Sequence, residues 1–214
     1  MLKADLHIHT RYSMDCDTPV PKIIERCGAL GINCIAVADH GTIEGALEMQ
    51  KAAPFTVIVA EEILTPHGEI MGMFLKEGIP SRIPIEKAIE QIRAQDGLVA
   101  IPHPFDKLRG MGFNSRILEE IVASIDIIEV FNARTPLQRY SERAQNFARQ
   151  HNLVGSAGSD AHSTDEIGNA YLEMPEFNSK DEFLQALDKG KIFGHRSSLL
   201  VHFYSNWARL KKAF

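Results

Sequence analysis

The chain has 214 residues, of which 44% are hydrophobic and 24% are charged, and its formal net charge is −5 at pH 7. This length and composition fit one globular domain with a substantial core. The acidic balance argues against a protein that wraps nucleic acid by charge alone. No apolar run approaches the roughly 20 residues that a membrane span needs.

The cysteines and the start of the chain indicate the cellular compartment in which the protein works. The beginning, MLKADLHIHT, lacks the long apolar core of a signal peptide. Cys16, Cys27 and Cys34 form no CxxC pair. An odd number of cysteines without an export signal predicts reduced thiols and a cytoplasmic protein.

Strand-like and helix-like runs alternate along the first half of the chain. Apolar runs of strand length are separated by runs with helical spacing of their apolar residues. In chain order, the expected elements are a strand at 3–9, a helix at 20–31, a strand at 32–40, a helix at 42–53 and strands at 55–64 and 68–75.

The second half continues the same alternation. The expected elements are a helix at 84–97, a strand at 98–104, a helix at 115–124, a strand at 125–132, a helix at 136–152, a strand at 153–162 and a helix at 179–190. Alternating strands and helices imply a parallel sheet covered by helices. About seven such units favour an α/β barrel over an open sheet, within a single domain at 1–214.

The tail FYSNWARLKKAF has an aromatic face and a basic face. We expect a terminal helix that packs Trp207 and Phe214 on the barrel. A helix for a membrane surface or a partner is the alternative.

Ionisable residues gather where the expected strands end. In a parallel barrel the carboxyl ends of the strands converge on one face, which holds the active site. The sequence therefore predicts that residues far apart in the chain meet there, namely His7, His9, His40, Glu62, His103, Asp160 and His162.

Each of these residues alone has an ordinary structural interpretation. His7 and His9 point the same way on a strand, but an isolated HxH is more often structural than not. Burying six or seven ionisable groups together would be very costly unless metal ions compensate them. Imidazole and carboxylate without thiolate suit zinc, manganese or iron. More than four ligands implies two or three divalent ions, with Glu62 or Asp160 as candidate bridges.

The segments DLHIHTRYSMD, ADHGT, AEEI, IPHPF and GSDAH resemble the motifs of the PHP (polymerase and histidinol phosphatase) family of metal-dependent phosphoesterases. The resemblance implies a distorted (β/α)7 TIM-like barrel that binds two or three metal ions. It implies the following metal ligands: His7, His9, Asp15, His40, Glu62, His103, Asp160 and His162.

Three positions depart from a simple match to the motifs. Met14 lies between Ser13 and the matching Asp15, which leaves Asp17 as a competitor, and Glu61 is a less favoured neighbour of Glu62. Many members carry a further histidine where this chain has Asn132, a poorer ligand for zinc-like ions. This difference favours two firm metal sites over three.

The expected reaction is hydrolysis of a phosphate ester by a metal-activated hydroxide. The expected catalytic residues are Asp160, Glu62 and His162, with His162 as proton donor to the leaving oxygen. Arg134, Arg196 and Asn132 are candidates for substrate binding, because the planar guanidinium of arginine matches two phosphate oxygens.

The expected partner is a small phosphorylated substrate, with a nucleotide or an oligonucleotide end among the candidates, and no membrane. Two alternatives remain open. The same barrel could cleave a C–N bond, because loops set the substrate, or it could serve as an accessory PHP module in a nucleic-acid-processing assembly.

Overall fold

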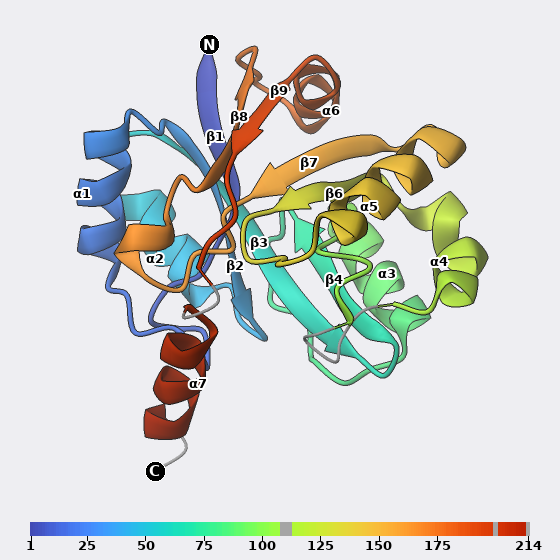
Figure 1. The fold of residues 1–214 in the computed structure, drawn as a ribbon, viewed down its shortest axis with the longest axis horizontal. Helices are drawn as coiled ribbons and strands as arrows, with labels where there is room; N and C mark the ends of the chain where they lie inside the picture. The colour runs from blue at the N-terminus through green and yellow to red at the C-terminus, as the bar shows by residue number, and fades with distance from the viewer. Residues whose placement is uncertain (108–112, 199–200, 213–214) are drawn as a thin grey trace.

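The computed structural model describes residues 1–107, 113–198 and 201–212 (Figure 1). Its strands are β1 (Leu2–Ile8), β2 (Cys34–His40), β3 (Thr56–Thr65), β4 (Gly68–Met73), β5 (Leu98–Ile101), β6 (Ile127–Asn132), β7 (Val154–Gly158), β8 (Ala170–Met174) and β9 (Lys191–Gly194). Its α-helices are α1 (Val20–Leu30), α2 (Glu44–Ala52), α3 (Ile85–Ala94), α4 (Ser115–Ile121), α5 (Gln138–His151), α6 (Lys180–Asp188) and α7 (Val201–Lys212). Two short 3-10 helices are η2 (Val122–Ser124) and η3 (Thr164–Glu166).

The strands form one sheet that curls into a nearly closed barrel. Their order is β7-β6-β5-β4-β3-β2-β1-β8-β9. The barrel closes where β7 meets β1, through a parallel bridge between Ile8 and Ala161. The His9 amide donates to the Ala161 carbonyl at 3.0 Å, and the Asp160 amide donates to the His7 carbonyl at 2.7 Å. The predicted α/β barrel in one domain is therefore confirmed.

The prediction of a parallel sheet with strictly alternating strands and helices is wrong at two places. β4 pairs antiparallel with both β3 and β5, and β8 and β9 extend the sheet antiparallel beyond β1. Only two residues separate β3 from β4, and the Thr65 hydroxyl donates to the Gly68 carbonyl at 2.7 Å across this turn. Parallel strands need a crossover of a dozen or more residues, so this connection permits only a hairpin.

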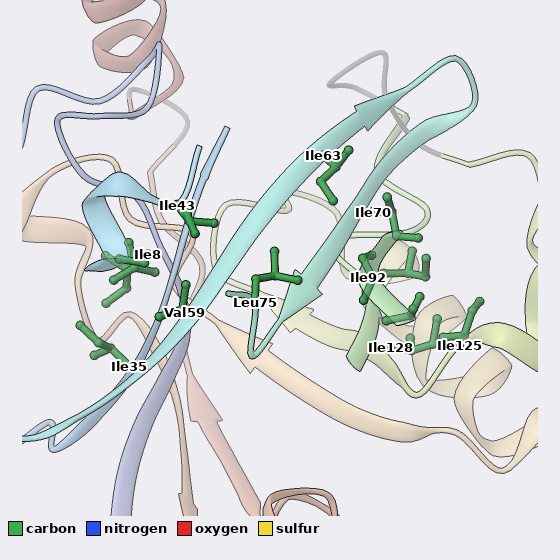
Figure 2. Close-up of a cluster of buried hydrophobic side chains, with 14 of the residues drawn as sticks. Ile8, Ile35, Ile43, Val59, Ile63, Ile70, Leu75, Ile92, Ile125 and Ile128 are labelled. Atoms are coloured by element: carbon green, nitrogen blue, oxygen red, sulfur yellow. The ribbon is translucent and has the colours of Figure 1, made fainter. Parts of the chain in front are cut away.

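Alternating side chains along each strand divide the core into two clusters. On β2, Ile35 and Val37 belong to an outer cluster between the barrel and the helices, whereas Ala36 and Ala38 belong to an inner cluster inside the barrel. Figure 2 shows the outer cluster, which is rich in isoleucine. Alanine suits the narrow interior, and β-branched residues fill the wider space under the helices.

The helices cover the two sides of the barrel. Figure 1 shows α1 and α2 on one side and α3, α4 and α5 on the other, with α7 at the end of the molecule opposite the N-terminus. None of the helices in the described ranges has the length and apolar character needed to cross a membrane. The expectation that Trp207 packs on the barrel is wrong, since 60% of this residue is exposed on α7. Phe214 lies outside the described residues.

Gly158 permits the close approach that shuts the barrel. A Cβ atom at this position would lie 2.3 Å from the His7 Cβ and 2.7 Å from the His7 backbone nitrogen. Neither atom can move without displacing β1. A side chain at residue 158 would therefore separate β7 from β1.

We predict that Gly158→Ala lowers the free energy of unfolding by about 3 kcal/mol, the upper range of the cost of overpacking a core. Denaturant unfolding followed by circular dichroism measures this change. Gly28→Ala in α1 is the control. A Cβ there meets nothing within 4 Å, so we expect a gain of roughly 0.5–1 kcal/mol. Equal stability of Gly158→Ala and the wild type would contradict the proposed closure.

Candidate metal centre

A β-bulge turns the first strand so that two histidines point into the barrel. Ala4 and Leu6 belong to the inner cluster, but Ile8 belongs to the outer cluster. The pairing of β1 with β2 shifts register between Asp5 and Ile8. An extra residue in one strand reverses which side chains face inward. The side chains of His7 and His9 therefore point into the barrel, just past Leu6, the last residue of β1 in the inner apolar cluster.

The other expected site residues lie at the same end of the barrel. His40 ends β2 and Glu62 lies late in β3, each on the inward-facing register of its strand. His103 follows β5, and Asp160 and His162 follow β7. Asp15 comes from the loop between β1 and α1. The structure thus brings together all eight residues that the sequence nominates.

Four overlapping sets of side chains among the described residues have donor atoms within 4.8 Å of one another. Such distances permit a single ion to contact every member of a set. The sets are His9, Asp15, His40 and His162; His7, Glu62 and His103; His7, His9 and Asp160; and His40, Glu62 and Glu69.

Glu69 is a member that sequence analysis missed. It lies on β4, 3.6 Å from His40 Nδ1 and 3.7 Å from His103 Nε2 through its two carboxylate oxygens. In the hairpin, Glu62 pairs with Met71, so Glu69, two residues from Met71, faces the same way as Glu62. The short turn between two apolar runs was the signal that could have revealed this carboxylate.

Two ambiguities of the sequence have a clear geometric answer. Asp15 lies within 3.4 Å of His40 and 3.3 Å of His162, whereas Asp17 is exposed and pairs with Lys211. Glu61 points away from the histidines and accepts a hydrogen bond from the Ile79 amide at 2.8 Å. Burial raises the pKa of Glu61 to about 7.

Carboxylates control the charge of the histidines. Burial alone would lower the pKa of His40, but Glu62 and Asp15 raise it to about 10. Burial likewise opposes the charged form of His7, yet Asp160, Glu129 and Glu62 hold its pKa well above the usual value. His9 differs, because burial and repulsion from His162 lower its pKa to about 3. The buried carboxylates therefore stabilise positive charge at this end of the barrel, whether on the imidazoles or on a bound cation.

Glu129 and Asn132 on β6 make hydrogen-bonding contacts with residues of the donor sets. Glu129 Oε1 lies 3.1 Å from His7 Nδ1, and its other oxygen accepts from the His103 amide at 2.7 Å. The Asn132 side-chain nitrogen donates to Glu129 at 2.9 Å and to Asp160 at 3.1 Å. Such partners fix the orientation of ligands. The amide nitrogen of Asn132 thus faces two carboxylates.

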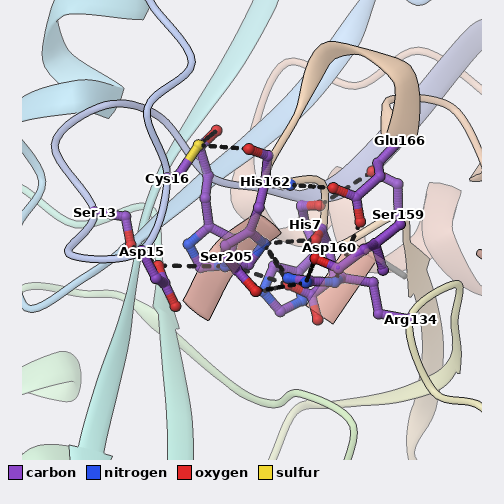
Figure 3. A network of polar contacts seen from close by, with 12 residues as sticks. His7, Ser13, Asp15, Cys16, Arg134, Ser159, Asp160, His162, Glu166 and Ser205 are labelled. Atoms are coloured by element: carbon purple, nitrogen blue, oxygen red, sulfur yellow. Dashed lines mark hydrogen bonds and ion pairs between the residues drawn. The ribbon is translucent and has the colours of Figure 1, made fainter. Parts of the chain in front are cut away.

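Arg134 is buried beside His162 (Figure 3). Its Nη1 lies 2.5 Å from His162 Nδ1, and its Nε lies 3.2 Å from the buried carboxylate of Glu166. Its Nη2 donates to the Val201 carbonyl and the Ser205 hydroxyl of α7. Both terminal nitrogens of this guanidinium therefore have hydrogen-bonding contacts, and Nε takes part in the ion pair with Glu166.

Arg196 lies farther along the same side of the barrel. Its Nε donates to the Thr135 carbonyl at 3.1 Å, and its Nη2 donates to the Ser141 hydroxyl at 3.4 Å. Thr135 and Ser141 also line a small cleft that His103 and Asn132 border. Arg196 is thus placed beside this cleft.

Two site residues have strained backbones. The φ angle is +28° at His103 and +55° at Asp160, in the region that favours glycine. A non-glycine residue remains there only when its surroundings enforce it. At Asp160 this includes the hydrogen bond from its amide to the His7 carbonyl, which also closes the barrel.

The donor set fits divalent metal ions. It combines imidazoles with carboxylates and contains no thiolate, since Cys16 lies nearby but donates its thiol hydrogen to the His162 carbonyl at 3.2 Å. His9 Nδ1 is buried without a hydrogen-bond partner among the described residues. The carboxylates that hold protons on His7 and His40 would equally stabilise cations.

We predict that metal loading releases about two protons at pH 7.5, because His7 and His40 are protonated there and must lose a proton to bind a metal. Metal affinity should therefore rise with pH up to about 10. Calorimetric titration with Mn²⁺ in buffers of different ionisation enthalpy counts the protons. His40→Asn should release about one proton fewer. Heats that do not depend on the buffer would contradict the predicted charge states.

Comparison with known proteins places this geometry in a family. Residues 138–192 match the family model described as PHP-associated. The uncharacterized protein MJ0417 of Methanocaldococcus jannaschii is 32% identical over 196 residues, which cover 87% of this chain and 79% of that protein.

Three solved structures share the fold. A domain predicted to be a PHP-like metal-dependent phosphoesterase, in a two-domain protein from Bacteroides vulgatus, matches with a TM-score of 0.71 and 19% identity over 99% of this chain and 69% of that chain. A protein from Bifidobacterium adolescentis proposed to be a metal-dependent phosphoesterase matches with a TM-score of 0.67 and 17% identity, covering 88% and 96%.

The third structure is described as an amidohydrolase from Chromobacterium violaceum with bound sulfate and no metal. It matches with a TM-score of 0.67 and 17% identity, over 89% of this chain and 97% of that chain. The five sequence motifs, the barrel and the match to the PHP-associated family agree, and the chain belongs to the PHP family.

Proposed function

We propose that this protein is a metal-dependent hydrolase that cleaves phosphate esters, either monoesters or nucleotide-type diesters. The observation that supports this most directly is the overlap of the four donor sets at one end of the barrel. Glu62 belongs to two of the sets, and so does His40. Shared donors are typical of a centre for neighbouring ions that act together on one substrate.

Seven of the nominated residues would hold the ions, with Glu69 as an additional carboxylate: His7, His9, Asp15, His40, Glu62, His103 and Asp160. Divalent ions bound there would supply an activated water and neutralise charge on the phosphoryl oxygens. Zinc, manganese and iron each suit this donor set. Glu129 and Asn132 would keep His7 and Asp160 in place.

Arg134 determines which nitrogen of His162 carries a proton. A guanidinium is always protonated, so Nδ1 of His162 accepts from it and the proton of the neutral ring lies on Nε2. Nε2 lies 3.3 Å from Asp15 Oδ1, within the donor cluster. His162 is therefore placed to donate a hydrogen bond from Nε2 to the leaving oxygen, whereas full proton transfer would need a second proton on Nδ1, where Arg134 now donates.

The ligand role of His162 requires another arrangement. With the proton on Nδ1, the ring would donate to the Asp160 carbonyl, 2.9 Å away, and Nε2 would be free to bind a metal. Arg134 would then have to leave, because two donors cannot share one nitrogen. The observed contact with Arg134 favours His162 as a hydrogen-bond donor through Nε2 over a metal ligand. The same contact makes Arg134 an orienting residue instead of a phosphate clamp.

We predict that Asp160→Asn lowers the rate of phosphate release from p-nitrophenyl phosphate or a nucleotide at least about 100-fold, as expected for a ligand change. A chelator should abolish wild-type activity, and added Mn²⁺ or Zn²⁺ should restore it. Asp17→Asn is the control, since Asp17 is exposed outside the cluster. Unchanged turnover in Asp160→Asn would rule out the proposed centre.

The same assay separates the alternatives. A panel of amides tests the C–N bond hydrolysis that the description of the Chromobacterium violaceum structure suggests. Amide turnover without phosphate release would favour that alternative. An accessory module of a larger assembly could lack metal after purification, so metal content should be measured first.

We predict that the double variant Arg134→Met, Glu166→Gln lowers kcat about 100-fold with little change in KM, because His162 loses its orienting donor. The second substitution removes the buried carboxylate that Arg134 neutralises. Arg196→Met is the control for loss of an arginine beside the cleft. A raised KM with unchanged kcat in the double variant would instead identify Arg134 as a phosphate clamp.

A further inference from the structure

Lys212, in the last turn of α7, reaches the loop that follows β1. Its ammonium donates to the carbonyl oxygens of Arg11, Ser13 and Cys16 at 2.6, 2.7 and 2.6 Å. An ammonium has three N–H donors, and here all three have an acceptor from one loop. The loop between β1 and α1 thus surrounds a cation that comes from the other end of the chain.

The convergence of these carbonyls needs a positive charge. Three carbonyl dipoles that point at one place repel one another, and hydrogen bonds to a charged donor are roughly twice as strong as neutral ones. Within the loop, the Cys16 amide lies 3.5 Å from the Ser13 carbonyl, the long end of the hydrogen-bond range. Shorter bonds hold other parts of the loop, from the Arg11 amide to the Thr18 carbonyl at 2.9 Å and from the Ser13 amide to the Thr10 carbonyl at 3.0 Å. The ammonium of Lys212 adds the charged donor that the three converging carbonyls share.

The loop places one of the nominated metal ligands. The Ser13 hydroxyl donates to Asp15 Oδ1 at 2.8 Å and accepts from the His40 amide at 3.3 Å. The Ser13 carbonyl is in turn held by Lys212. A short chain of contacts therefore connects Lys212 with the carboxylate that faces His40 and His162. Figure 3 shows the Ser13, Asp15 and His162 part of this chain.

The neighbouring lysine lacks the carbonyl contacts of Lys212. Lys211 pairs with Asp17 at 3.4 Å, and both side chains are about half exposed; Lys212 also lies 3.9 Å from the same carboxylate. Exposed pairs of this kind contribute little to stability. Lys211 therefore offers a matched control, since it lies on the same turn and has the same charge but does not contact the carbonyls of the loop.

We propose that Lys212 is a positioning residue whose ammonium occupies a backbone-carbonyl site and thereby sets Asp15 for a metal ion held with His9 and His40. This inference rests on the proposed metal-binding function of the cluster. α7 is then part of the metal centre, although none of its residues belongs to the donor sets found in the described ranges. Arg134 joins the first two turns of α7 to the same centre through Val201 and Ser205.

The first test titrates metal-free protein with Mn²⁺ and measures hydrogen exchange of the amides of residues 11–16. Lys212→Met should weaken one binding step about 10-fold, as other supporting residues of metal sites do. It should be the step that Asp15→Asn also weakens, and exchange of the loop should accelerate. Lys211→Met should match the wild type in both measurements.

The second test is chemical rescue. Lys212→Ala leaves room for a small cation, so millimolar methylammonium should restore the weakened binding step in this variant and leave the wild type unchanged. Unaltered metal affinity and exchange in Lys212→Met would overturn the proposal. Equal weakening of every binding step together with a lower Tm, or no rescue by methylammonium, would overturn it as well.

Neither test uses a substrate. Failure to detect phosphate release by the wild-type protein would count against the proposed reaction and would leave these measurements valid. Loss of the Lys212 effect in a protein that still hydrolyses phosphate esters would count against the positioning role alone.

Discussion

Mutual repulsion among buried acidic groups is the constraint on which this structure depends. Asp15, Glu62, Glu69, Glu129 and Asp160 lie buried around one end of the barrel. In this setting charges interact more strongly than in water, so the cluster needs compensating cations. Protons on His7 and His40 meet part of that need, and metal ions would meet it more fully. The strained backbones at His103 and Asp160 show that the fold maintains this arrangement at a cost.

Much of the site could be predicted because it follows the geometry of regular strands. His40 continues the inward register of Ala36 and Ala38, and Glu62 continues that of Ala60. A chain of short apolar strands that end in ionisable residues was enough to indicate both the barrel and the meeting of distant residues. The spacing of His7 and His9 also predicted that the two side chains face the same way.

What the sequence could not provide were irregularities and long-range contacts. The bulge that turns His7 and His9 inward has no local signature, since it depends on pairing with β2 and on the approach of Gly158. Glu69 was missed because it lies at the start of β4, and only the antiparallel pairing of β4 with β3 brings that start to the end of the barrel that holds the site. The contact between Arg134 and His162 joins two loops, and the position of Lys212 depends on how the last helix folds back. None of these contacts follows from periodicity.

The position of Lys212 has a consequence for biosynthesis. The strand that carries His7 and His9 is synthesised about 150 residues before β7, against which it closes, and the lysine that holds its loop comes later still. Translation at roughly 5–20 residues per second separates these events by many seconds. The nascent polypeptide exposes its first two histidines long before their partners exist. Closure of the centre thus has to wait until α7 has been made, and its timing is set by the direction of synthesis.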